Sequence, residues 1–114
     1  MPRRLTAVPG TIAVLIGLVH LVMAPRIYDQ VGFDALWFVG SGVAVILIGT
    51  LTILASSARA WRALVAAAFA ANLAGVGLAV VFGVLTGWSE PQGPVLLGVF
   101  ALGLTLCVSQ LRRA

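Results

Sequence analysis

Charged side chains are scarce in this chain of 114 residues, and acidic ones are the scarcest. Only 9% of the residues are charged, three of them acidic, while 61% are apolar. Soluble domains usually carry about 25% charged and about 45–50% apolar residues. A soluble core of this size cannot hide so much apolar surface, and a disordered chain would have the opposite composition. The composition therefore argues against both a water-soluble monomer and a disordered protein.

Residues that build reactive sites are few as well. Cys107 is the one cysteine, His20 is the one histidine, and every basic residue is an arginine. A lone cysteine offers neither an intrachain disulfide nor a Cys–His metal spacing, and we interpret Cys107 as a small hydrophobe. The absence of lysine excludes a Schiff base, and the absence of a second histidine excludes a paired-histidine haem site within one chain. We expect no metal and no cofactor.

What the chain does contain is four uncharged stretches, each longer than 20 residues, at 5–25, 35–58, 63–89 and 91–111. A transmembrane helix needs about 20 apolar residues, and backbone in lipid must satisfy its own hydrogen bonds. The sequence therefore predicts an all-α, four-helix transmembrane bundle with short loops, forming one membrane domain over residues 1–114. The predicted helices are 6–24, 34–56, 61–86 and 94–111, with Pro9 in the first turn, Pro25 at an exit and Asp34 as an N-cap.

The arginines predict one orientation of the four spans. Six of them fall on the side that holds both termini and the 58–62 connection, and only Arg26 falls on the other side with all three acids. The positive-inside rule then places both termini in the cytoplasm of a bacterial inner membrane. The net charge of +4 thus indicates orientation, and we expect no nucleic-acid partner. The N-terminal segment also resembles a signal peptide, but its apolar run is long and Pro25 would follow the cut, so we predict a retained helix.

Small residues recur at four-residue spacing along the predicted helix 61–86. Such a small-xxx-small ridge lets a neighbouring helix backbone approach closely, either within the bundle or in a homo-oligomer. Single copies of this pattern also arise by chance in an alanine-rich chain. We take the following six residues as candidates for helix packing: Ala63, Ala67, Ala71, Gly75, Ala79 and Gly83.

Polar residues at membrane depth are energetically costly, so each is a candidate site. Most lie toward the non-cytoplasmic side, which predicts a ligand pocket there with His20 and Asp34 at its base as possible acid–base groups. The other expected pocket residues are Tyr28, Trp37, Ser41, Asn72, Trp88 and Glu90. Structural roles compete at each position: interhelical hydrogen bonding for His20 and Asn72, capping for Asp34, and an interfacial aromatic belt for the tryptophans.

One group of known proteins shares several of these features. His20, Pro25, the run Phe33–Gly42 (FDALWFVGSG) and the run Ala71–Gly75 (ANLAG) resemble a group of small bacterial four-helix membrane proteins without assigned activity. The resemblance implies the four-helix topology and draws attention to His20, Asp34, Trp37 and Asn72, but it implies no reaction. Small multidrug antiporters match in length and helix count, yet the acid expected in the middle of their first helix is missing here.

Three functions remain open from the sequence. The first is a membrane protein that binds or moves a small apolar or amphipathic ligand through a pocket on the non-cytoplasmic side, as a homo-oligomer in contact with membrane lipids. The second is a small intramembrane enzyme that uses His20 and Asp34 for acid–base chemistry on a lipophilic substrate, such as an isomerisation or cyclisation. The third is an accessory subunit of a larger membrane complex.

Overall fold

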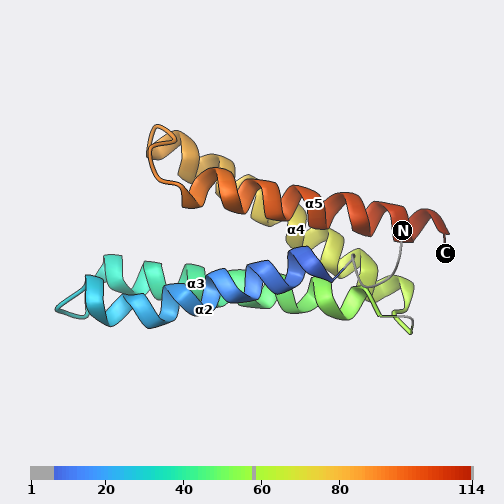
Figure 1. Cartoon of the computed structure of the whole chain (residues 1–114), viewed down its shortest axis with the longest axis horizontal. Coiled ribbons are helices and arrows are strands. Elements are labelled where there is room, and N and C mark those ends of the chain that lie inside the picture. Colours follow the sequence, from blue (N-terminus) through green and yellow to red (C-terminus); the bar gives the residue numbers. More distant parts are fainter. Residues whose placement is uncertain (1–6, 58, 114) are drawn as a thin grey trace.

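Four long α-helices joined by short connections account for nearly all of the described chain (Figure 1). The computed structural model describes residues 7–57 and 59–113, so Arg3, Arg4 and the predicted helix start at residue 6 lie outside the described residues. The helices within these ranges are α2 (Val8–Ile27), α3 (Phe33–Ala55), α4 (Arg62–Leu85) and α5 (Gln92–Arg113). All four are long and apolar enough to cross a membrane. The predicted all-α fold with four candidate spans is confirmed.

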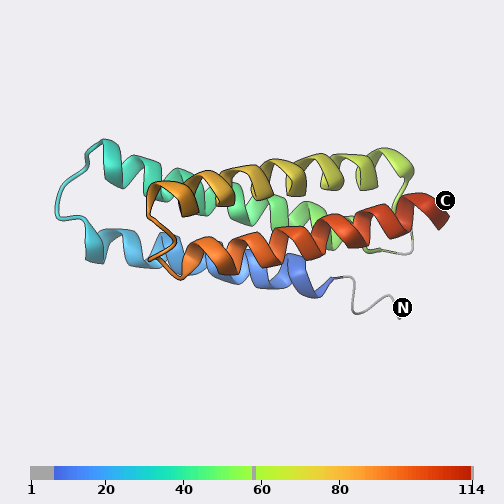
Figure 2. The ribbon, with the colours of Figure 1, turned by 90° about the horizontal axis from the view of Figure 1, so that it is seen from above.

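The helices form two antiparallel hairpins, α2–α3 and α4–α5, that lie along a common axis (Figures 1 and 2). The beginning of α2, the α3–α4 connection and the end of α5 lie together at what we call the terminal end. The α2–α3 and α4–α5 loops lie at the opposite end, the loop end. Figure 1 shows the two hairpins close together at the terminal end and diverging toward the loop end.

Two prolines lie inside helices that were predicted to stop or start beside them. Helix α2 continues through Pro25 to Ile27. Because Pro25 is in the last turn, it removes one backbone hydrogen bond, and the Tyr28 amide still bonds the Ala24 carbonyl oxygen at 3.0 Å. Helix α5 starts at Gln92, two residues before Pro94. Proline is tolerated at this position because the amides in the first turn of a helix have no intrahelical acceptor.

Asp34 is not the N-cap of α3, which corrects the prediction. Gly32 holds the cap position in an extended conformation, and no side chain caps the helix. Asp34 is instead the second residue of the helix, where its carboxylate still interacts favourably with the helix dipole. Its side chain remains exposed at the surface of the loop end.

Helix α2 packs on α3 through two pairs of facing glycines. A Cβ placed on Gly49 would lie 2.6 Å from the Gly10 carbonyl oxygen, and one on Gly17 would lie 2.6 Å from the Gly42 carbonyl oxygen. The pairs are seven residues apart on both helices, so they lie on one face of each and fix the antiparallel register of this hairpin. Only glycine allows the two backbones this close.

The helices meet in two layers of buried side chains, most of them small. One layer takes one residue from each helix, namely Ala13, Val45, Ala79 and Phe100. A second, nearer the terminal end, contains Ala55, Val65, Ala68 and Cys107. Large apolar side chains point outward instead, including Leu15, Leu47 and Leu78, each more than half exposed. A bundle with small residues inside and large apolar residues outside is typical of helices that face lipid.

The predicted small-residue ridge on α4 is buried in its second half and exposed in its first half. Gly75, Ala79 and Gly83 are buried and Ala71 is half-buried, whereas Ala63 and Ala67 are exposed. A four-residue step advances about 40° beyond one helical turn, so such a ridge winds around the helix. The face that packs within the chain follows a mixture of three- and four-residue steps instead, through Val65, Ala68, Asn72, Gly75, Ala79 and Gly83.

Candidate functional site

His20 lies half-buried on α2, packed against α3. Its ring stacks on the ring of Phe38 with centroids 4.7 Å apart, and its Cβ lies over Gly42. The Nδ1 atom lies 3.0 Å from the carbonyl oxygen of Ile16, one turn earlier. Because a carbonyl oxygen only accepts, this geometry requires Nδ1 to carry a proton, and a neutral ring then has its lone pair on Nε2.

The rings of Phe38 and Tyr28 connect His20 with the loop end. Phe38 stacks on His20 on one side, and the ring of Tyr28 tilts against Phe38 with centroids 5.7 Å apart. Tyr28 is the C-cap residue of α2, where the chain leaves the helix in an extended conformation. The three side chains form a continuous ladder from inside the α2–α3 hairpin to its loop.

A hollow lies at the outer end of this ladder, between the end of α2 and the start of α3. We call it the loop-end hollow, and it is lined by Ile27, Tyr28, Asp29, Gln30, Gly32, Phe33, Asp34 and Ala35. Two carboxylates and two aromatic rings share this small surface, and one arginine, Arg26, lies in the last turn of α2. The carboxylates outnumber the nearby basic group, so the hollow suits a ligand with a positive or hydrogen-bond-donating head.

The other expected pocket residues lie elsewhere on the molecule. Trp37 projects from α3 with 68% of its surface exposed. Ser41 donates to the Phe38 carbonyl oxygen at 2.8 Å, within its own helix. Glu90 is exposed in the α4–α5 loop of the second hairpin, which diverges from the first hairpin at this end. The structure therefore brings Tyr28 and Asp34 together in the loop-end hollow. His20, which was expected at the base of the pocket with Asp34, does not line this hollow, and neither do Trp37, Ser41 and Glu90.

Trp88 is held by the turn that ends α4. The Trp88 amide donates to the Gly83 carbonyl oxygen at 2.7 Å and the Gly87 amide donates to that of Val84 at 3.2 Å. These two bonds form a Schellman motif, in which Gly87 takes the left-handed conformation that glycine favours. The Trp88 ring covers Gly83, where any Cβ would collide with it. Trp88 thus closes its own hairpin and does not reach the loop-end hollow.

Asn72 lies in the interior of the bundle, 2% exposed, and not in a pocket. Its Nδ2 donates to Thr52 Oγ1 on α3 and to the Ala68 carbonyl oxygen, both at 2.8 Å. Thr52 in turn donates to the Ile48 carbonyl oxygen at 2.9 Å. The Asn72 Oδ1 faces Gly103 on α5, where a Cβ would collide with it. Asn72 therefore links three helices, which is the structural role weighed for it from the sequence.

Sequence reasoning missed Phe38, although it is the residue that connects His20 with the loop-end hollow. The spacing of the glycines could have found it. Gly10 and Gly17 on one helix and Gly42 and Gly49 on the next share a seven-residue step. An antiparallel register through both pairs places residue 38 opposite residue 21, next to His20. Aromatic residues alone are too frequent in such helices to single it out.

No protein-family model, curated protein or solved structure matches this chain. Within residues 7–57 and 59–113, His, Cys, Asp and Glu side chains form no group of three or more that could hold a metal ion. The chemistry of the loop-end hollow is therefore the main guide to a function.

Proposed function

We propose that this chain is an integral protein of a bacterial inner membrane, with both termini cytoplasmic, and that it binds a small amphipathic molecule in the loop-end hollow. The observation that carries the proposal is the joint presence of Asp29, Asp34 and Tyr28 in one hollow at the end of two apolar helices. A basic or donor head would lie on the carboxylates, and an apolar body would lie against the exposed ring of Phe33 and the adjoining lipid. With the arginine-rich end in the cytoplasm, the hollow opens on the other side.

The proposal includes a homo-oligomer in contact with membrane lipids. Exposed small residues on α4, among them Ala63, Ala67 and Gly77, support it, because a Cβ on Gly77 would meet nothing within 4 Å in its own chain. Replacement of Gly77 by Leu should dissociate such an oligomer without unfolding the chain, as measured by sedimentation in detergent. Monomers at all concentrations would contradict the oligomer, and co-purification with a larger protein would support an accessory subunit in its place.

Binding is tested with three probes of one chain length: an alkyl quaternary ammonium, an alkyl alcohol and an alkyl sulfate. We expect the ammonium to bind most tightly to the protein in nanodiscs, measured by calorimetry. The Asp29→Asn/Asp34→Asn variant should weaken the binding of ammonium about two- to 30-fold, since each of the two exposed ion pairs contributes about 0.2–1 kcal/mol. Glu90→Gln removes a carboxylate from the same end outside the hollow and should leave binding unchanged. Equal effects of the two variants, or equal affinity for all three probes, would refute the proposal.

A second candidate, an acid–base enzyme acting on a lipophilic substrate, is supported by the hydrogen bond from His20 to Ile16. That bond leaves Nε2 of a neutral His20 as an acceptor, which is what a general base requires. If a bound molecule is converted, mass spectrometry of the extracted ligand will show a product. A substrate would then reach His20 itself, and His20→Ala should abolish conversion. Loss of thermal stability without loss of turnover per folded protein would identify His20 as structural.

A further inference from the structure

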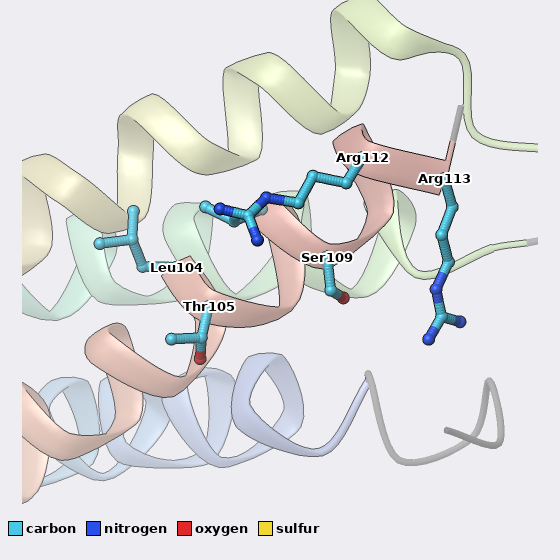
Figure 3. A pocket seen from close by; sticks show the side chains of 6 residues that line it. Leu104, Thr105, Ser109, Arg112 and Arg113 are labelled. Carbon is cyan, nitrogen blue, oxygen red and sulfur yellow. The ribbon is translucent and has the colours of Figure 1, made fainter.

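A second hollow lies at the terminal end, on the last turns of α5 (Figure 3). We call it the terminal-end hollow, and the described residues that line it are Leu104, Thr105, Val108, Ser109, Arg112 and Arg113. It lies at the opposite end of the bundle from the loop-end hollow and plays no part in the function proposed above. Its lining joins apolar side chains, hydroxyl groups and the two arginines that end the helix.

The lining residues form two parallel rows along α5. Leu104, Val108 and Arg112 follow one another at four-residue spacing, and Thr105, Ser109 and Arg113 do the same one position later. Residues four apart lie on the same face of a helix, so each row runs lengthwise and ends at an arginine. The rows span eight residues, or about 12 Å at 1.5 Å per residue.

The hydroxyl groups of the second row both donate to the backbone of α5, which leaves Arg112 and Arg113 as the donors available to a ligand. The Ser109 hydroxyl donates to the Leu106 carbonyl oxygen at 2.8 Å. The Thr105 hydroxyl donates to the backbone as well, at 2.8 Å from the Leu102 carbonyl oxygen. Both hydroxyl hydrogens are therefore used inside the helix. Figure 3 shows Arg112 folded back along α5 toward the turn of Leu104, while Arg113 extends from the helix end in another direction. The two guanidinium groups thus start from adjacent residues at the helix end and point in different directions.

We propose that the terminal-end hollow holds one anionic phospholipid of the adjoining leaflet. Both arginines are exposed, and the bound phosphate group brings their guanidinium groups together at the helix end, because guanidinium matches phosphate oxygens in charge and geometry. An acyl chain lies along Leu104 and Val108, and the headgroup extends past the end of α5. The rows are about 12 Å long, close to the thickness of one leaflet's hydrocarbon layer, which is about 15 Å. Charge, apolar lining and length together fit this lipid.

The test is a titration followed by native mass spectrometry, with phosphatidylglycerol and phosphatidylcholine of identical acyl chains. We expect phosphatidylglycerol to bind in a 1:1 complex and at least tenfold more tightly than phosphatidylcholine. Arg112→Gln/Arg113→Gln should weaken phosphatidylglycerol binding about 30-fold, because each basic residue near anionic lipid contributes about fivefold. Val108→Trp keeps both arginines but fills the hollow, and it should weaken binding at least fivefold.

The matched control is Arg59→Gln/Arg62→Gln, which removes the same charge from the same end but on the α3–α4 side. This variant should bind phosphatidylglycerol within threefold of the unaltered protein. Circular dichroism melts confirm that all variants are folded before their affinities are compared. An equal loss in both arginine pairs would show diffuse charge attraction and overturn the proposal. Equal affinity for the two lipids, or full binding by Val108→Trp, would overturn it as well.

Discussion

At the residue scale, Asn72 shows what the sequence can and cannot predict about a polar side chain in this bundle. Its position near the middle of an apolar stretch predicts that it must find a hydrogen-bond partner. The identity of that partner, Thr52, depends on how α3 and α4 are rotated and shifted relative to each other. Nothing local to residue 52 distinguishes it from Thr50, which is two residues away, exposed, and bonded only within its own helix.

Gly103 provides the residue-scale prediction. A methyl group there would collide with the Asn72 carboxamide, so Gly103→Ala should lower the free energy of unfolding by about 1–3 kcal/mol, as overpacked cores do. Gly98→Ala is the matched control on the same helix, since a Cβ at Gly98 meets nothing within 4 Å. Chemical unfolding in detergent, followed by circular dichroism, measures both variants.

The Gly103 prediction is specific to one contact. Asn72→Ala frees the space beside residue 103, so the double variant Asn72→Ala/Gly103→Ala should be more stable than the sum of the two single changes implies. The expected coupling for residues in contact is about 0.5–3 kcal/mol. Strict additivity would contradict the contact, as would an equal effect of Gly98→Ala.

At the scale of elements, the positions of the helices could be predicted closely but the contacts between them could not. Uncharged stretches of about 20 residues with flanking charges predict where each helix lies. The predicted helix ends were wrong mainly at Pro25 and Pro94, because a helix tolerates proline in a terminal turn. The four-residue pattern on α4 identified Gly75, Ala79 and Gly83 but also included Ala63 and Ala67, which are exposed. Periodicity alone does not predict which part of a small-residue ridge contacts a neighbouring helix of the same chain.

The α2–α3 hairpin provides the prediction at this scale. Gly49→Ala places a methyl group 2.6 Å from the Gly10 carbonyl oxygen and 2.9 Å from Val14 Cγ2, so the helices must separate. We expect a loss of about 1–3 kcal/mol in the free energy of unfolding. Gly40→Ala on the same helix meets nothing within 4 Å and should be neutral or slightly stabilising because alanine favours helix. If the two variants have the same stability, the glycine pair does not set the approach of α2 and α3.

At the scale of the whole molecule, four candidate spans follow from composition alone because the apolar stretches leave little chain for anything else. Composition does not predict the contact between the rings of Tyr28, Phe38 and His20. This contact joins residues from two helices, and its register is determined by how the helices pack. The expected pocket between the two hairpins likewise depended on their angle, which no local pattern encodes. The hairpins diverge at the loop end (Figure 1), and the loop-end hollow belongs to one hairpin.

Orientation is the prediction for the whole molecule, because it depends on the arginines of every loop together. In a Cys107→Ala background, Ser89→Cys puts a thiol in the α4–α5 loop and Ser57→Cys puts one in the α3–α4 connection, both at exposed positions. With the arginine-rich end cytoplasmic, a membrane-impermeant maleimide should label Ser89→Cys in intact cells and Ser57→Cys only after permeabilisation. The unaltered chain is the control, since its only thiol, Cys107, is buried. Labelling of both sites in intact cells would mean two orientations, and the reverse pattern would mean that the arginines do not set the topology.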